Sequence, residues 1–183
     1  MIPVERERPD IARRRRWWLR WQLGVDPSRL VFIDETALRT DMTRLRGRAL
    51  GTTGVQCSMV MEGAMNAEAF ALFVKQVLVP TLTPGQIVVL DNLASHKGRN
   101  VKRMIRQAGC RLVFLPPYGY DLNPIELAFS KLKQLVRGAA ARTVNALWDA
   151  AGRVANAITP SDAAGFFTAC GYHSIATHES APL

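Results

Sequence analysis

Three acidic residues stand where short apolar segments end or a helix begins. Asp34 directly follows the run LVFI, Asp91 follows the run IVVL, and Glu126 lies in the first turn of a helix expected after an Asn-Pro pair. Clustered carboxylates repel one another unless cations fill the site, and hard oxygen ligands of this kind suit Mg²⁺ or Mn²⁺. Two such ions clamp the attacking and leaving oxygens of an in-line phosphodiester displacement. The three residues therefore predict metal-dependent chemistry on a phosphodiester.

Each of these carboxylates also has a purely structural explanation. Asp34 and Asp91 are suited to Asx turns or to capping of the next segment. Glu126 stands three residues after Asn123, which is the spacing of a capping box. The matched strand ends and the basic helices around them, taken together, favour a functional site over three separate structural roles.

The elements that must position these residues alternate along the chain, which predicts an α/β domain. Strands are expected at residues 30–33, 55–61, 87–90 and 111–115. Helices are expected at residues 10–24, 66–79 and 124–137. A basic helix is expected between Asp91 and Ala108, and two last helices are expected to start at Thr143 and Ser161. Open α/β sheets bind ligands beyond the carboxyl ends of their parallel strands, so we expect Asp34 and Asp91 at that edge.

The charge of the chain points to a polyanionic partner. Lys and Arg number 24 against 15 Asp and Glu, which gives a net charge of +9 and a pI near 10.2. A surplus of this size favours a polyanionic partner and says nothing about fold. Between Asp91 and Asp121 there is no acidic residue. The residues expected to contact the polyanionic partner are Lys97, Arg99, Lys102, Arg103, Arg106 and Lys133.

Residues 1–26 form an expected basic, amphipathic, helical lead-in. The cluster Arg13–Arg16 is followed at once by Trp17 and Trp18, and Trp21 falls on the same helical face as these two. We favour docking of the tryptophans on the domain with solvated arginines, because charge runs are usually solvated. Direct contact of the arginines with DNA is the alternative.

Composition and length exclude several classes of protein. A chain of 183 residues with 48% hydrophobic residues is long enough for one domain with a real core, and it is neither disordered nor collagen-like. Three scattered cysteines argue against a disulfide framework and a zinc site. No apolar stretch reaches the ~18–20 residues of a membrane span, and the first ten residues lack the apolar core of a signal peptide. We expect a soluble, cytoplasmic protein without a membrane partner.

Two long motifs carry a family resemblance. They are VLDNLASHK at 89–97 and FLPPYGYDLNPIE at 114–126. Together they strongly resemble the catalytic core of bacterial insertion-sequence transposases related to Tc/mariner elements, which are DDE transposases with an RNase H-like fold. The 34 residues that separate Asp91 from Glu126 match the interval of that family. Shorter similarities are VFIDET at 31–36, LRGR at 45–48, GAMN at 63–66 and AAART at 139–143.

The resemblance implies a fold and an activity. It implies an RNase H-like DDE catalytic domain over residues 27–172, with a mixed sheet flanked by helices, and a frayed tail over 173–183. It implies that a water attacks a DNA phosphodiester and that the freed 3′-OH then attacks target DNA, with Mg²⁺ or Mn²⁺, as two ions, as cofactor. The expected partners are element ends and target DNA, the expected location is the bacterial nucleoid, and a homo-oligomer is left open. The implied catalytic residues and metal ligands are Asp34, Asp91 and Glu126.

Further residues match positions beside the site of that family. They are Glu35, Asn92 and His96. His96 either touches substrate or holds its loop, and the sequence does not separate these alternatives. Lys97 is expected beside a phosphate rather than in the chemical step.

The sequence departs from the family pattern in two places. The family carries an N-terminal helix-turn-helix region, for which there is no room before Asp34. The interval after Arg48 is short, so we expect part of the antiparallel edge of the sheet to be missing and one edge of the 30–34 strand to be bare. The alternatives to an active transposase are a truncated, inactive DNA-binding remnant and a host nuclease of the same fold.

Overall fold

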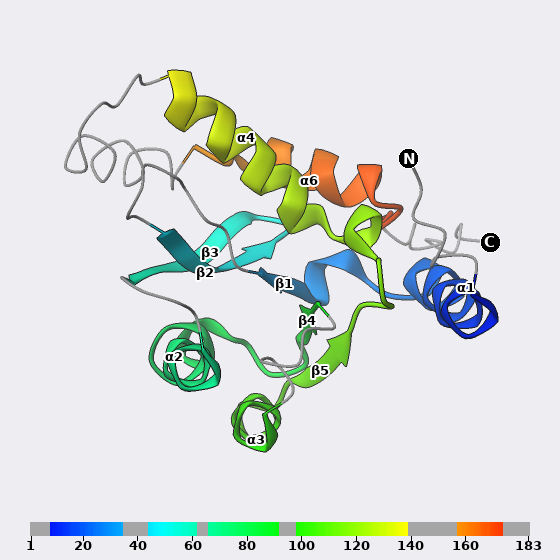
Figure 1. Cartoon of the computed structure of the whole chain (residues 1–183), viewed down its shortest axis with the longest axis horizontal. Coiled ribbons are helices and arrows are strands. Elements are labelled where there is room, and N and C mark those ends of the chain that lie inside the picture. The colour runs from blue at the N-terminus through cyan, green and yellow to red at the C-terminus, as the bar shows by residue number, and fades with distance from the viewer. Residues whose placement is uncertain (1–7, 35–43, 62–65, 92–97, 139–156, 174–183) are drawn as a thin grey trace, which may run out of the picture.

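A five-stranded mixed sheet forms the centre of the computed structural model, which describes residues 8–34, 44–61, 66–91, 98–138 and 157–173 (Figure 1). Its strands are β1 (Leu30–Asp34), β2 (Arg44–Gly51), β3 (Gly54–Met61), β4 (Ile87–Leu90) and β5 (Arg111–Phe114). They lie in the order β3-β2-β1-β4-β5. β1, β4 and β5 are parallel, whereas β2 and β3 run antiparallel.

Helices cover both faces of this sheet (Figure 1). The helix bounds are α1 (Pro9–Leu23), α2 (Ala67–Phe73), α3 (Arg99–Gln107), α4 (Pro124–Gly138) and α6 (Pro160–Ala169). A π-helical turn (Val74–Leu78) continues α2, and short 3₁₀ turns occupy Pro27–Arg29, Val79–Thr81 and Tyr120–Leu122. Helices α4 and α6 lie on one face and α2 and α3 on the other, while α1 lies beside the sheet. No helix within these described ranges is long and apolar enough to cross a membrane.

The central strands are buried on both faces, as their unbroken apolar runs predict. In β1, Leu30 and Phe32 belong to the core under α4 and α6, and Val31 and Ile33 belong to the core over α2 and α3. Strand β4 alternates in the same way. Because side chains alternate along a strand, the residue after each apolar run falls on the α4 side of the sheet.

The antiparallel edge of the sheet is present, so the expected loss of part of it is wrong. Strand β1 pairs with β2 on one side and with β4 on the other, which leaves neither of its edges bare. Strands β2 and β3 form a hairpin whose turn is closed at Gly54, where φ is 118°. The sequence does not predict β2, because its arginines alternate within a polar stretch. The turn between β2 and β3 is short, so the interval between β1 and α2 is long enough for both strands.

The helix starts differ in detail from the sequence prediction. Asn66 caps α2 as expected, since its side chain accepts a hydrogen bond from the Ala69 N–H at 2.8 Å. Helix α6 is capped by Thr159 rather than Ser161, because Thr159 and Asp162 form a reciprocal capping box. The helix expected from Thr143 lies outside the described residues, as do residues 174–183 of the tail expected over 173–183.

Helix α1 is fastened to the domain near the loop that precedes α4. The indole of Trp18 is buried, and its Nε1 donates to the Tyr172 hydroxyl at 3.0 Å. That hydroxyl donates in turn to the Leu122 carbonyl at 2.8 Å. Arg15 adds an ion pair to Asp121, with 2.7 Å between Nη2 and Oδ2. The docking of α1 expected from its tryptophans is therefore achieved chiefly by Trp18.

Candidate active site

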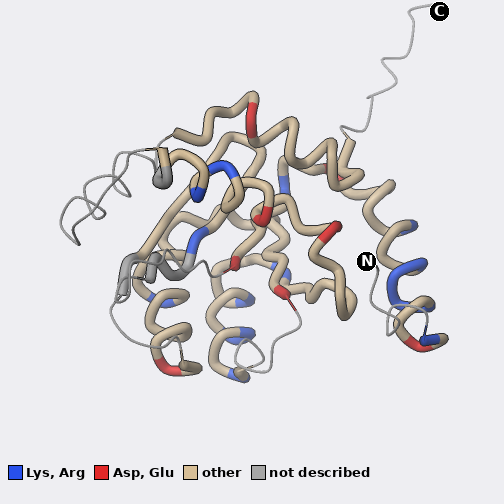
Figure 2. Tube along the Cα trace, turned by 45° about the horizontal axis from the view of Figure 1, so that its top comes forward, with Lys and Arg blue, Asp and Glu red and all other residues tan. Residues whose placement is uncertain are grey.

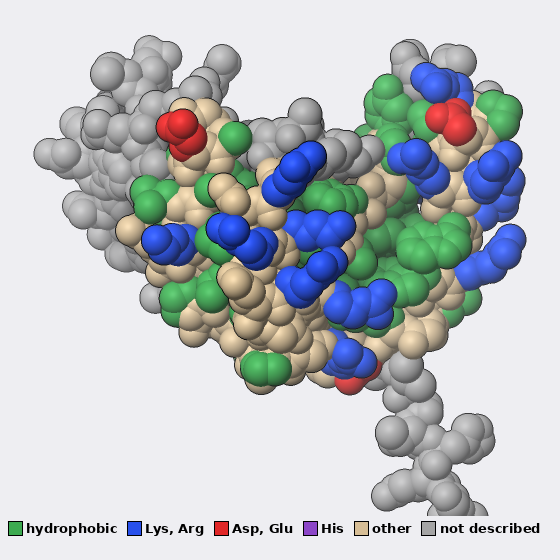
Figure 3. Space-filling view, turned by 90° about the horizontal axis from the view of Figure 1, so that it is seen from below, with side chains coloured by type: hydrophobic (Ala, Val, Ile, Leu, Met, Phe, Trp, Pro, Cys, Tyr) green, Lys and Arg blue, Asp and Glu red, His purple; other side chains and the backbone are tan. Residues whose placement is uncertain are grey.

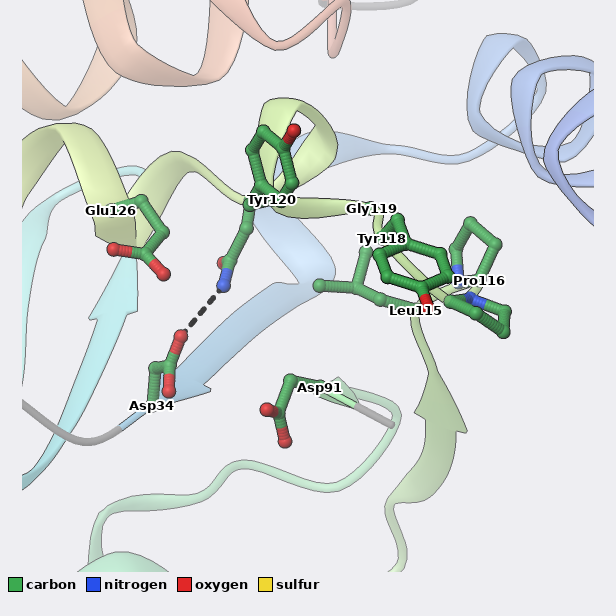
Figure 4. Close-up of a pocket in the computed structure, with 10 residues that line it drawn as sticks. Asp34, Asp91, Leu115, Pro116, Tyr118, Gly119, Tyr120 and Glu126 are labelled. Carbon is green, nitrogen blue, oxygen red and sulfur yellow. Dashed lines mark hydrogen bonds between the residues drawn. The ribbon is translucent and has the colours of Figure 1, made fainter. Parts of the chain in front are cut away.

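A cleft of about 520 Å³ lies at the edge of the sheet where β1 and β4 end (Figure 4). We call it the acidic cleft. It is lined by Asp34, Asp91, Leu115, Pro116, Pro117, Tyr118, Gly119, Tyr120, Asn123 and Glu126. All three carboxylates singled out from the sequence thus line one space.

The register of two parallel strands brings the two aspartates together. Ile33 of β1 pairs with Leu90 of β4, so Asp34 and Asp91 are the next residues on neighbouring strands. By strand alternation both side chains project to the α4 face. Asp34 is buried at 8% exposure, and Asp91 is half-buried. In Figure 4 both carboxylates lie on the same side of the cleft.

Glu126 reaches the cleft from the first turn of α4 (Figure 4). The helix begins at Pro124, whose fixed φ suits the first helical position. Ile125 and Phe129 hold its inner face against the core. The Glu126 side chain consequently lies above the strand ends that carry the two aspartates.

Burial and a neighbouring charge raise the pKa of Glu126. Desolvation raises the pKa of the Glu126 carboxyl above its ordinary value, and the negative charge of Asp91 raises it further. Lys133, on the same helix, lowers that pKa and so offsets part of the shift. Interacting carboxylates with a raised pKa are a feature of functional sites, although ion-pair networks also produce them.

We predict that Glu126→Gln stabilises the metal-free protein at neutral pH. An acid whose pKa is raised on folding destabilises the fold where it is ionised, and this cost disappears below the unfolded pKa, 4.5. The gain in free energy of unfolding should therefore shrink as pH falls from neutral towards 4.5. Urea titrations across this range test it, with Glu68→Gln, an exposed change on α2, as control. A gain that grows on acidification would contradict the prediction.

Asn123 is a site residue that the sequence presents only as a helix opener. Its Nδ2 donates to Asp34 Oδ2 at 2.9 Å, and its side chain is 2% exposed (Figure 4). The bond joins residues 89 positions apart and fixes the Asp34 carboxylate relative to the start of α4. A hydrogen bond to a charged group is stronger than one between neutral groups. Asn123 therefore positions one carboxylate of the acidic cleft.

Asn123→Ala should lower the free energy of unfolding by about 1–3 kcal/mol, because Asp34 loses a buried donor. Chemical denaturation measures the change. Asn100→Ala removes an exposed asparagine from α3 and should stay within about 0.5 kcal/mol of wild type. Equal stabilities of the two variants would show that the Asn123 bond contributes nothing.

The loop that follows β5 is tight and lines one wall of the acidic cleft. Tyr118 has a φ of 57°, in the left-handed region that most side chains avoid. A Cβ atom on Gly119 would lie 2.7 Å from the Pro116 carbonyl oxygen, so only glycine fits there. The Arg15–Asp121 ion pair and the Tyr172 hydrogen bond hold the same loop from outside. Arg15, near the start of the described chain, and Tyr172, near its end, thus both hold this loop in place.

The remaining predicted residues fall into two groups. Glu35, Asn92, His96 and Lys97 lie outside the described residues. The basic residues of α3 are all exposed on its outer face: Arg99, Lys102, Arg103 and Arg106. Figure 2 shows basic positions along several helices, with acidic positions both near the middle of the molecule and at its periphery. Lys133 is half-buried, and its charge acts on Glu126.

The carboxylates fit a hard divalent cation by their chemistry. Among the residues that the structure describes, no three His, Cys, Asp or Glu side chains already lie close enough together to hold a metal ion. Asp34, Asp91 and Glu126 nevertheless line one cleft, and the charge of Asp91 acts on Glu126. An all-oxygen set of this kind suits Mg²⁺ or Mn²⁺.

A family match covers more than half of the chain. Residues 49–148 match the model of the DDE superfamily endonucleases. The chain belongs to this family. The DDE endonuclease activity predicted from the sequence is thereby confirmed at the level of the family, and the matched range includes Asp91 and Glu126. No curated protein matches the chain.

Solved structures share the fold of this DDE endonuclease. The Mos1 transposase catalytic domain with raltegravir and Mn superposes with a TM-score of 0.59 at 18% identity, over 94% of this chain and 100% of that chain. The BIV integrase catalytic core superposes with a TM-score of 0.55 at 18% identity, over 74% of this chain and 92% of that chain. The Mos1 paired-end complex with left transposon end superposes with a TM-score of 0.57 at 16% identity, over 96% of this chain and 66% of that chain. These likenesses confirm the predicted RNase H-like fold.

Proposed function

We propose that this DDE endonuclease is the catalytic domain of a DNA transposase from a bacterial insertion sequence. A water attacks a DNA phosphodiester in line and its 3′-oxygen leaves as a free 3′-OH. That 3′-OH then attacks a phosphodiester of target DNA in line, which forms a new phosphodiester and releases a 3′-OH of the target strand. The observation that carries the proposal is the acidic cleft, where Asp34, Asp91 and Glu126 come from two neighbouring strands and one helix.

Asp34, Asp91 and Glu126 would hold Mg²⁺ or Mn²⁺, as two ions. When bound, such ions lower the pKa of a water and neutralise charge on the transferring phosphate. The chain itself supplies the positions of the ligands. Asn123 orients Asp34, the start of α4 presents Glu126, and the loop with Gly119 closes one side of the acidic cleft.

The DNA would run over the basic face of the molecule. Seen from below, Lys and Arg side chains form a band across the side that α2 and α3 cover (Figure 3). Phosphate contacts of this kind give affinity without base specificity. The proposed contacts on this face are Arg99, Lys102, Arg103 and Arg106 of α3, together with Lys97. Lys133 is a proposed contact from the α4 side of the acidic cleft. The proposed neighbours of the site are Glu35, Asn92 and His96. Element ends and target DNA would be the substrates of residues 27–172, with residues 1–26 as a basic lead-in.

The double variant Lys102→Ala/Arg103→Ala should bind unrelated duplexes with similarly reduced affinity. Each lost phosphate contact should reduce the salt slope of the binding constant by about 0.9. Fluorescence anisotropy at several salt concentrations measures the slope. Gln107→Ala, an exposed neutral change on α3, is the control. An unchanged slope in the double variant would mean that this face is solvated and does not contact DNA.

Nicking of a supercoiled plasmid that carries terminal inverted repeats tests the proposed activity. Wild type should convert the plasmid to open circles in Mg²⁺ or Mn²⁺, and EDTA should abolish the reaction. DNA binding without any metal-dependent cleavage would contradict the proposal and favour the inactive remnant. That alternative rested on the missing sheet edge, and the β2–β3 hairpin removes this ground.

A further inference from the structure

A second cleft, of about 390 Å³, lies beside the acidic cleft between α1 and the end of β5. We call it the tryptophan cleft. It is lined by Arg13, Arg14, Trp17, Trp18, Phe114, Leu115 and Pro116. Leu115 and Pro116 also line the acidic cleft, so these two residues form the ridge between the clefts. A strand that occupies the acidic cleft can therefore continue over the ridge into the tryptophan cleft.

Trp17 offers a flat, fixed and exposed ring in this cleft. Its side chain is 58% exposed, although large apolar side chains are usually buried. It stacks on Trp21 with 6.2 Å between ring centroids and 10° between planes. It also meets the buried Trp18 edge-on at 6.4 Å. Two neighbours thus hold the ring in place, so little side-chain freedom is lost when a second flat ring stacks on it.

Two arginines flank this ring. Arg13 and Arg14 precede Trp17 by four and three positions, which places all three on one side of α1. Both arginines are exposed, whereas Arg15 is engaged in the ion pair with Asp121. No acidic residue occurs among the described residues that line the tryptophan cleft. Figure 3 shows hydrophobic side chains in a hollow bordered by Lys and Arg.

We propose that the tryptophan cleft binds an unpaired nucleotide of the DNA strand whose phosphodiester lies in the acidic cleft. The base stacks on Trp17, and Arg13 and Arg14 contact the adjacent phosphates. Sequence-tolerant stacking on aromatic rings beside a basic groove is how proteins hold single-stranded DNA. This inference rests on the proposed function, because it assumes that DNA occupies the acidic cleft. The inference assigns the exposed Trp17 a role in binding an unpaired strand end.

Binding of two DNA probes in EDTA tests the inference without cleavage. One probe is a blunt duplex, and the other is the same duplex with a short single-stranded tail. Trp17→Ala should weaken binding of the tailed duplex about 5- to 150-fold, the range of one base–aromatic stack, and leave the blunt duplex unchanged. Trp17→Tyr should restore most of the affinity. Arg13→Ala/Arg14→Ala should lower the salt slope for the tailed duplex.

Controls and an abasic scan make the test specific. Leu23→Ala and Arg20→Ala change exposed side chains of α1 that do not line the tryptophan cleft, and both should bind the tailed duplex as wild type does. An abasic nucleotide at the stacked position should cost wild type as much affinity as Trp17→Ala does, and the two changes should not add.

Three results would overturn the inference. The first is an equal loss of affinity for blunt and tailed duplexes, and the second is additive effects of Trp17→Ala and the abasic nucleotide. The third is a Trp17→Ala variant with unchanged DNA binding but a smaller sedimentation coefficient, which would make this cleft an interface between copies of the chain. The plasmid-nicking assay of wild type reports on the proposed function separately. Trp17-dependent tail binding without nicking would therefore refute the enzyme and not the nucleotide site.

Discussion

Asp91→Asn should reduce Mg²⁺-dependent nicking at least ~100-fold, because changes even in the groups around metal ligands reduce activity 10- to 100-fold. The substitution keeps the shape of the side chain and removes its charge from the acidic cleft. It should also lower the pKa of Glu126 towards its ordinary value, since the Asp91 charge contributes to raising it. Initial rates on supercoiled plasmid measure the first effect.

Asp10→Asn is the matched control for that experiment. Asp10 is exposed in the first turn of α1 and does not line the acidic cleft. Its loss should leave nicking unchanged. Metal-free DNA binding by Asp91→Asn should hold or improve, because a negative charge has left the path of the DNA. Nicking at the wild-type rate in Asp91→Asn would remove this residue from the catalytic set.

Trp18→Ala should lower the free energy of unfolding by about 3–5 kcal/mol, the usual cost of deleting a large buried aromatic side chain. The ring is 1% exposed, and its loss also takes a donor from the Tyr172 hydroxyl. Urea denaturation followed by circular dichroism measures the change. The effect should be the largest among changes in α1, because Trp18 is the residue that joins this helix to the core.

Trp17→Ala provides the comparison on the same helix. Its side chain is largely exposed, so its loss should cost far less stability than the loss of Trp18. The two variants should therefore separate: Trp18→Ala loses stability, and Trp17→Ala loses binding of the single-stranded tail. Similar stabilities of the two variants would mean that α1 is not held by Trp18.

The strand-end aspartates could be predicted because local pattern determines them. An unbroken apolar run that ends in Asp indicates a buried parallel strand with a carboxylate at its end, and this holds for Asp34 and Asp91. Parallel neighbours then need only a common register to bring the two carboxylates together. Glu126 could be placed for a similar reason, since an Asn-Pro pair marks the helix start.

Contacts between distant residues could not be predicted in this way. The bond from Asn123 to Asp34 depends on how α4 sits over the sheet, which no local pattern encodes. The unequal burial of Trp17 and Trp18 depends on where Tyr172 lies. Strand β2 could not be predicted for another reason. Its alternating arginines lack the apolar pattern of a buried strand, and its strand conformation depends on backbone pairing with β1.

The bond between Trp18 and Tyr172 also bears on how the protein is made. The two residues are 154 positions apart, and Tyr172 in turn holds the loop at Leu122. At about 5–20 residues per second, a ribosome takes about 8–30 s to cover that distance. During that time Trp18 of α1 has no Tyr172 hydroxyl to donate to. The loop beside the acidic cleft likewise lacks the hydrogen bond from that hydroxyl to the Leu122 carbonyl. The nascent chain thus completes this end of its site only after nearly all of the domain has been translated, and until then the Trp18 indole lacks the hydroxyl that accepts its hydrogen bond.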